Sequence, residues 1–170
     1  EFRRVLFRSL EGIGRGSPEE IDLVVAARFF EELHAGVRVS ILNLEGRAGI
    51  FAHDVELSVE VVRAAAVCGR PLWAKLSPNT DRLVEVAGAV AEAGAEAVTL
   101  INTVLGMVID TDTGRAVLGR GGGGLSGAAI HPVAVRAVYD VRTAHPTLPI
   151  IGVGGVTDGR SALELLMAGA

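Results

Sequence analysis

Stretches with helical spacing of apolar residues alternate along the chain with short runs that are almost entirely apolar. Apolar residues three and four positions apart predict helices, and short apolar runs bounded by glycine, proline or polar residues predict buried strands. Helices are expected over residues 21–33, 56–67, 81–93, 132–143 and 161–167. Strands are expected over residues 37–42, 71–76, 97–101 and 149–153. Residues 102–127 show no clear period, so no regular element is predicted there.

The predicted strands are short, nearly all apolar and separated by helices. This order is typical of a parallel sheet covered by helices on both faces, so the predicted fold class is α/β. Ligands of such proteins bind at the carboxyl ends of the strands. The chemistry is therefore expected in the loops that begin at Asn43, Ser77, Asn102 and Gly154.

Composition and charge limit the classes of function. Hydrophobic residues make up 49% of the 170 positions, which is enough for one packed domain and excludes disorder over most of the length. The net charge of −4 provides no basic face, so no binding to nucleic acid or to an anionic membrane surface is expected. The most hydrophobic stretch, residues 86–109, is interrupted by Glu92, Glu96 and glycines, so no membrane span is expected.

A single cysteine, Cys68, excludes an intrachain disulfide and a cysteine-built zinc site, which favours a cytoplasmic protein. Its place near the end of a predicted helix favours a packing role.

Residues 1–9 carry three arginines without a secretion-signal pattern, so they are interpreted as a non-native or disordered leader, with a targeting peptide as the alternative. Residues 10–170 are interpreted as one domain.

The only lysine of the sequence, Lys75, lies inside an otherwise apolar predicted strand. Burying an ammonium group is costly, so such a lysine normally faces an anion or an electron-rich ligand. A contact with a cofactor is the favoured interpretation, and pairing with a structural carboxylate is the alternative.

Three loop segments are candidates for ligand binding. Asn102 and Thr103 follow the predicted strand 97–101, where an amide can bind a planar amide-containing ring or simply form a turn. The glycine-rich segment 121–127 is either a flexible linker or a loop that comes close to a ligand. The glycine turn at 152–159 follows a strand and precedes a helix, an arrangement that can hold a phosphate group.

The four histidines are scattered without the spacing of metal ligands, so no metal site is expected and surface or capping roles are predicted for them. They are His34, His53, His131 and His145.

Several motifs in one order resemble dihydroorotate dehydrogenase. They are Lys-Leu-Ser-Pro-Asn at 75–79, the segment 101–110, Gly-Gly-Leu-Ser-Gly at 123–127 and Ile-Gly-Val-Gly-Gly at 151–155. The resemblance is greatest to the NAD-linked bacterial type, whose FMN-bearing catalytic subunit pairs with an electron-transfer subunit that carries FAD and an iron–sulfur cluster. It implies oxidation of dihydroorotate to orotate in pyrimidine (UMP) biosynthesis, in a protein that forms homodimers.

The resemblance also implies a fold and site residues. The family fold is an FMN-binding (β/α)₈ TIM barrel of about 250 residues, of which this chain supplies about four β/α units. The resemblance implies that Lys75 contacts the flavin ring and that Ile101 and Gly127 line its site. Gly154 and Gly155 are implied to bind the flavin phosphate. The pyrimidine substrate is implied to bind to Asn43, Asn102 and Thr103.

This sequence departs from the family where the catalytic base belongs. The family carries Asn-Leu-Ser-Cys-Pro-Asn there, and this chain has Arg38 through Asn43, with Ile41 at the position of the base. Isoleucine has no proton to exchange, so general-base catalysis should be lost. The alternatives to dihydroorotate oxidation are another FMN barrel oxidoreductase acting on a related pyrimidine and a non-catalytic remnant that binds flavin or a partner.

Overall fold

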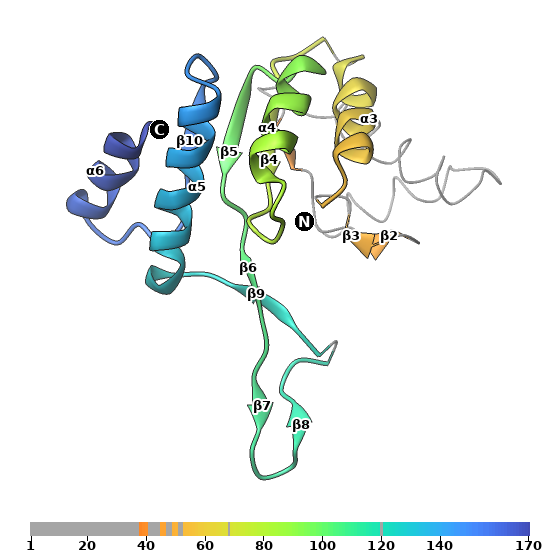
Figure 1. Ribbon diagram of the computed structural model, residues 1–170. Coiled ribbons are helices and arrows are strands. Elements are labelled where there is room, and N and C mark those ends of the chain that lie inside the picture. The colour runs from red at the N-terminus through yellow and green to blue at the C-terminus, as the bar shows by residue number, and fades with distance from the viewer. Residues whose placement is uncertain (1–37, 41–44, 47–48, 51–52, 68, 120) are drawn as a thin grey trace, which may run out of the picture.

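The computed structural model describes residues 38–40, 45–46, 49–50, 53–67, 69–119 and 121–170 (Figure 1). Several features expected from the sequence lie outside the described residues. They are the leader 1–9, the helix 21–33, His34, Ile41, Asn43 and Cys68.

The centre of the described structure is a four-stranded parallel sheet. Its strands are β1 (Arg38–Ser40), β4 (Trp73–Leu76), β5 (Ala97–Leu100) and β10 (Ile150–Gly152), which neighbour one another in that order. All three pairings are parallel. The predicted α/β class with a parallel sheet is therefore confirmed, and each strand lies within the range expected for it.

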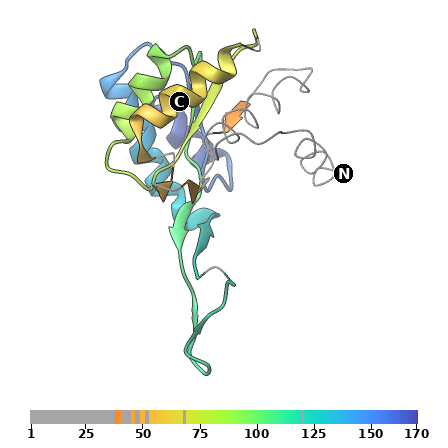
Figure 2. The same ribbon diagram turned by 90° about the vertical axis from the view of Figure 1, so that its right-hand side faces the viewer.

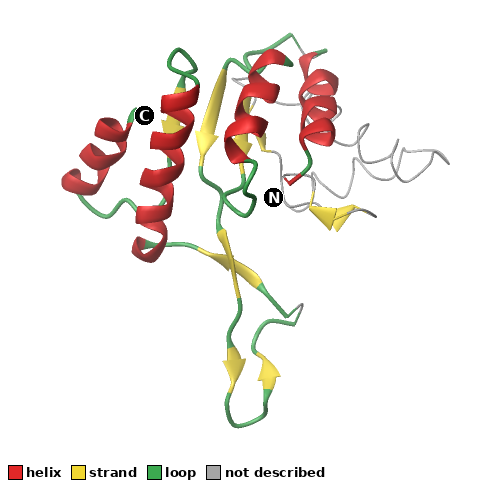
Figure 3. Ribbon diagram, in the orientation of Figure 1, coloured by secondary structure: helices red, strands yellow, loops and turns green. Residues whose placement is uncertain are grey.

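Four helices lie close to the ranges expected from periodicity (Figure 3). They are α3 (Val55–Ala66), α4 (Leu83–Glu92), α5 (His131–Ala144) and α6 (Gly159–Ala168), and a short 3₁₀ helix, η2 (Ala128–Ile130), precedes α5. No described helix is long and apolar enough to cross a membrane.

The hydrophobic core lies between one face of the sheet and helices α4 and α5, which stand in front of the strands in Figure 1. Ala74, Leu76, Val98 and Leu100 point into it and are at most 1% exposed. Of the side chains that alternate with them, Trp73 is exposed, Lys75 and Thr99 are half-buried, and the small Ala97 is buried. Among the described elements, α4 and α5 pack on this one face, so the prediction that helices cover both faces of the sheet is wrong for this part of the chain.

Residues 102–127 form an arm of antiparallel strands that projects from the carboxyl ends of the sheet in both views (Figures 1 and 2). Strand β6 (Val104–Gly106) pairs with β9 (Gly123–Leu125), and β7 (Ile109–Asp110) pairs with β8 (Arg115–Ala116). The expectation of no regular structure here is thus wrong. These strands of two or three residues are too short to show a period in the sequence.

The glycines of β9 permit this pairing rather than prevent it. A Cβ atom at Gly124 would collide with the side chain of Thr103, so only glycine lets the two segments lie side by side. A separate short hairpin joins β2 (Glu45–Gly46) to β3 (Gly49–Ile50).

Candidate functional site

A cleft of about 430 Å³ opens at the carboxyl ends of β4, β5 and β10. This volume lies within the range of about 300–1,000 Å³ that is typical of small-molecule sites. Its lining includes every described residue to which the sequence assigned a binding role, namely Lys75, Ile101, Asn102, Thr103, Gly127, Gly154 and Gly155. It also includes Ser126, Gly152, Val153 and Val156, which lie in the two glycine-rich segments expected to bind a ligand, and Ile130, for which the sequence predicted no role.

Strand β4 presents Lys75 to the cleft. Ala74 and Leu76 on either side are buried in the core, so the alternation of a strand turns Lys75 to the opposite, half-buried face. No carboxylate in the described part of the chain forms an ion pair with Lys75. The alternative role, pairing with a structural carboxylate, thus has no support in these residues, and the ammonium group is available to a ligand.

The loop after β5 is held in place by main-chain and amide hydrogen bonds. The N–H of Asn102 donates to the carbonyl oxygen of Leu76 at 2.8 Å, and the Oδ1 atom of Asn102 accepts from the N–H of Thr103 at 2.9 Å. Asn79 fixes the same loop, because its Nδ2 donates to the carbonyl oxygen of Thr103 at 3.0 Å and its Oδ1 accepts from the N–H of Leu105 at 2.8 Å. Asn79 lies in the motif at 75–79, but the sequence predicts no role for this residue.

The glycine turn after β10 has the geometry expected of a phosphate cradle. Gly154 and Gly155 have φ angles of 141° and 64°, and a Cβ atom at Gly155 would lie 2.7 Å from the carbonyl oxygen of Gly127. Within the described part of the chain, the N–H groups of Gly154, Gly155 and Val156 have no hydrogen-bond acceptor. Free N–H groups in a glycine turn before a helix form a ready site for an anion.

Helix α6 begins directly after this turn and is fixed there by a capping box. The carboxylate of Asp158 accepts from the N–H of Ser161 at 2.8 Å, and the N–H of Asp158 donates to Ser161 Oγ at 3.1 Å. The hydrogen bonds from Ser161 lower the pKa of Asp158, because they stabilise the ionised carboxylate.

Replacing Asp158 with asparagine should make the stability of the chain less sensitive to acid. Because folding lowers the pKa of Asp158, its charge stabilises the fold above the carboxyl group's ordinary pKa, and this contribution is lost as the pH falls through the folded-state value. Asparagine keeps an oxygen acceptor for the helix start but does not ionise. Thermal melts from about pH 6 to about pH 3 should therefore show a smaller decrease in Tm for D158N than for the wild type. Equal decreases in Tm for the two proteins would show that ionised Asp158 does not contribute to the stability of the fold.

His131 is the C-cap residue of η2, which agrees with a capping role, but its side chain does not lie on the surface as the alternative prediction had it. It is the first residue of α5 but only 9% exposed, and its ring contacts both the glycine turn and helix α6. His145, at the carboxyl end of α5, does cap that helix, and its Nε2 lies 3.0 Å from the carbonyl oxygen of Val84. Within the described ranges, no three His, Cys, Asp or Glu side chains form a group that could hold a metal ion.

The fold and the site together define a class of protein: an α/β protein with three features at the carboxyl ends of its parallel strands. These are a glycine turn, a lysine side chain that forms no ion pair within the described residues, and a pair of amide and hydroxyl side chains. The comparisons with known proteins identify the family. The sequence profile of the family "Dihydroorotate dehydrogenase" matches residues 24–170. The chain belongs to the dihydroorotate dehydrogenase family.

Its relatives include the catalytic subunit of dihydroorotate dehydrogenase B (NAD(+)) from two organisms. The chain is 44% identical over 135 residues to the protein of Exiguobacterium sibiricum and 51% identical over 136 residues to that of Methanosarcina acetivorans. Each alignment covers 79% of this chain and 43% of the relative. The chain therefore spans about half the length, or less, of the curated relatives it matches.

A solved structure shows the same fold. The crystal structure of a ligand-free type of dihydroorotate dehydrogenase from Eimeria tenella superposes with a TM-score of 0.67 at 17% sequence identity. The superposition covers 92% of this chain and 49% of that one.

Proposed function

We propose that the chain binds FMN in the cleft at the carboxyl ends of β4, β5 and β10, as part of a dihydroorotate dehydrogenase catalytic subunit that oxidises dihydroorotate to orotate. The observation that carries this proposal is that Lys75, Asn102, Thr103 and the glycine turn line one cleft. Membership of the family, whose reaction is flavin-dependent, supports FMN as the cofactor.

Each part of the cleft suits a different part of FMN and its substrate. The N–H groups of Gly154, Gly155 and Val156 suit a phosphate group, and Ile101 and Gly127 would flank the ring. Lys75 places a positive charge where it would stabilise an electron-rich ring edge. Asn102 and Thr103, with Asn43 assisting, would bind the amide and carboxylate groups of the pyrimidine. FMN, when bound, supplies the hydride acceptor.

The sheet is proposed to be about half of a (β/α)₈ barrel. Its four parallel strands neighbour one another in chain order, as barrel closure requires, and the matched relatives are about twice as long as this chain. The half-exposed face that carries Lys75 would then face the barrel interior.

The partners follow from the relatives and from the arm. The name "catalytic subunit" of the relatives implies a second subunit. We propose that this partner is the electron-transfer subunit of this enzyme type, which carries FAD and an iron–sulfur cluster, and that both act in the cytoplasm.

For self-association, the arm offers apolar side chains that are about half exposed or more, including Met107, Val108, Ile109 and Val117. Exposed apolar side chains grouped on one projecting segment are typical of an interface. A second copy of the chain is therefore the proposed occupant of the arm surface.

Charges on the arm should dissociate that dimer. We expect sedimentation to show a dimer for the wild-type chain and a monomer for the double variant Met107→Asp with Val117→Asp, since two buried, unpaired carboxylates oppose association. Thr111→Asp, at the exposed tip of the arm between β7 and β8, is the matched control and should remain dimeric. A dimer that survives the double substitution would place the interface elsewhere.

A titration with FMN tests the proposal. Purified chain should quench flavin fluorescence on binding and stay yellow after free FMN is removed. Anaerobic dihydroorotate should then bleach the bound flavin slowly, because Ile41 stands where the family has its base. Colour without bleaching by dihydroorotate would favour the non-catalytic remnant, and bleaching by a related pyrimidine instead would favour the other oxidoreductase. A colourless protein would overturn flavin binding.

A further inference from the structure

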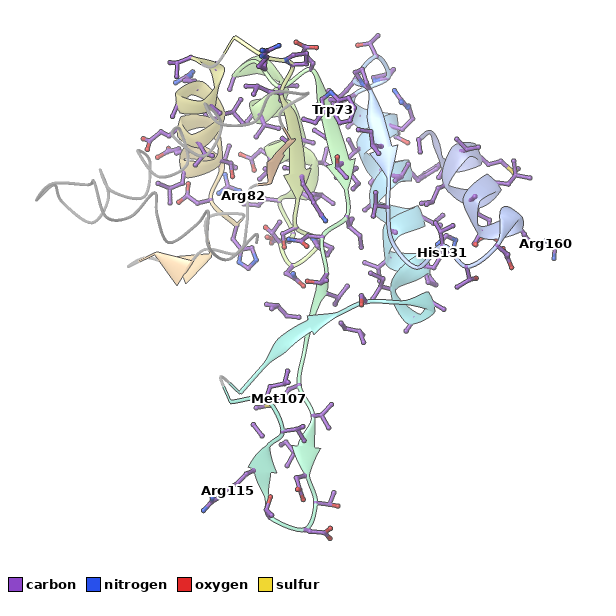
Figure 4. The ribbon with its side chains drawn as sticks, turned by 180° about the vertical axis from the view of Figure 1, so that it is seen from behind. Trp73, Arg82, Met107, Arg115, His131 and Arg160 are labelled. Carbon is purple, nitrogen blue, oxygen red and sulfur yellow. The ribbon has the colours of Figure 1, made fainter. Side chains whose placement is uncertain are left out.

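The ring of His131 connects the phosphate cradle to helix α6. Its Nδ1 lies 2.9 Å from the carbonyl oxygen of Gly154, and its Nε2 lies 3.0 Å from Oε2 of Glu164. Figure 4 shows His131 at the start of α5, on the side that faces α6. Only 11% of its side chain is exposed, against 53% for Glu164, so the geometry of the ring is set by its neighbours.

Both neighbours of the ring are hydrogen-bond acceptors. A carbonyl oxygen and an ionised carboxylate have no proton to give, and a neutral imidazole has only one N–H group. The two hydrogen bonds can therefore exist together only when His131 is an imidazolium, with both nitrogens protonated. The other charged groups near the ring are Asp158, at the start of α6, and Arg136, which lines the same surface groove between α5 and α6.

The bond to Gly154 determines where the next N–H group points. In a trans peptide the C=O and N–H groups are antiparallel. The carbonyl of Gly154 points toward His131, so the N–H of Gly155, in the same peptide unit, points away from the ring. Gly155 lines the cleft, and its backbone is close enough to His131 that a Cβ atom there would lie 2.9 Å from His131 Cβ.

We propose that His131 is a positioning residue: as an imidazolium it holds the peptide between Gly154 and Gly155 in the orientation that binds phosphate, and loss of its proton weakens binding of FMN but not of riboflavin. This inference rests on the proposed function. In the neutral ring the single N–H favours the carboxylate of Glu164, the stronger acceptor. The Nδ1 lone pair then faces the carbonyl oxygen of Gly154, and the peptide is released.

Two substitutions separate the two hydrogen bonds. In His131→Asn the side-chain amide nitrogen takes the place of Nδ1, so the bond to Gly154 is kept at every pH while the bond to Glu164 is lost. In His131→Gln the amide takes the place of Nε2, so the bond to Gly154 is lost. His145→Gln is the matched control, because His145 lies at the opposite end of α5 and outside the cleft.

The experiment measures Kd for FMN and for riboflavin from about pH 6 to about pH 8, the range in which histidine changes charge. The FMN phosphate also ionises in this range, but it does so equally for every variant. The change of Kd with pH is therefore compared between variants. Relative to H131N, the wild type and H145Q should lose about tenfold in FMN affinity across this range, the value of one charge-assisted hydrogen bond. H131Q should bind FMN about tenfold more weakly than H131N throughout, and riboflavin binding should not differ among the four proteins.

Parallel pH profiles for the wild type and H131N, or equal FMN affinity for H131Q and H131N, would overturn the inference while leaving the proposed function intact. If the wild type binds no FMN at any pH, the proposed function itself is overturned, and the inference with it. ¹⁵N NMR of the imidazole provides a readout without flavin. Both ring nitrogens of His131 should carry a proton while the two hydrogen bonds persist, and a ring with a single N–H group in that state would also contradict the inference.

Discussion

Replacing Gly155 with alanine should weaken FMN binding by about a hundredfold or more while the chain remains folded. The added Cβ would lie 2.7 Å from the carbonyl oxygen of Gly127 and 2.9 Å from both Cβ and the backbone nitrogen of His131. These are backbone atoms and a packed side chain, so the turn itself must shift. The φ angle of 64° adds strain for any residue with a side chain. Loss of two phosphate-binding N–H groups, each a charge-assisted hydrogen bond, corresponds to about this change in affinity.

Gly159→Ala is the control for this prediction. Gly159 is the first residue of α6, only four positions along, and a Cβ atom there meets nothing within 4 Å. Alanine should be neutral or slightly stabilising at this position, with unchanged FMN affinity. The measurement is a fluorescence titration with FMN and with riboflavin, accompanied by thermal melts. Equal FMN affinity for G155A and G159A would show that the glycine turn does not bind the phosphate.

Restoring the base should give the largest gain in activity. Ile41→Cys combined with Arg38→Asn returns the family's residues to both positions, and a positioned general base contributes about 10²–10⁴-fold to the rate of proton removal. In this chain joined to the remaining half of a relative, the rate of flavin reduction by dihydroorotate should increase by about that factor. Stopped-flow absorbance under anaerobic conditions measures it.

The matched control is Ile41→Ala with Arg38→Asn, which changes the same two positions without adding an ionisable group. It should leave flavin reduction near the rate of the parent chain. A cysteine variant no faster than this alanine variant would show that position 41 does not hold the base in this protein.

The sequence predicts the helices of the described fold because each is long enough to show its period, and the strands of the sheet because they are apolar runs between those helices. Helix α5 spans fourteen residues, and Pro132 in its first turn marks its start. The arm could not be predicted in the same way. Strands β7 and β8 have two residues each, and the pairing of β6 with β9 depends on Gly124 leaving space for Thr103, a contact between segments far apart in the chain.

In the candidate site, too, some residues could be predicted from the sequence and others could not. Lys75 and the glycine turn stood out because an ammonium in an apolar strand and two glycines after a strand are chemically unusual wherever they occur. Asn79 and His131 did not stand out. Their contacts join residues 23 to 33 positions apart along the chain, and no local pattern in the sequence reports such contacts.

The central claim is that the cleft holds FMN with its phosphate on the glycine turn. A ¹H–¹⁵N spectrum of the chain, recorded with FMN and with riboflavin, tests it most directly. The amide signals of Gly154, Gly155 and Val156 should shift with FMN and stay in place with riboflavin, because only FMN carries the phosphate. Signals that shift only elsewhere, or these three signals unchanged at saturating FMN, would contradict phosphate binding at the glycine turn.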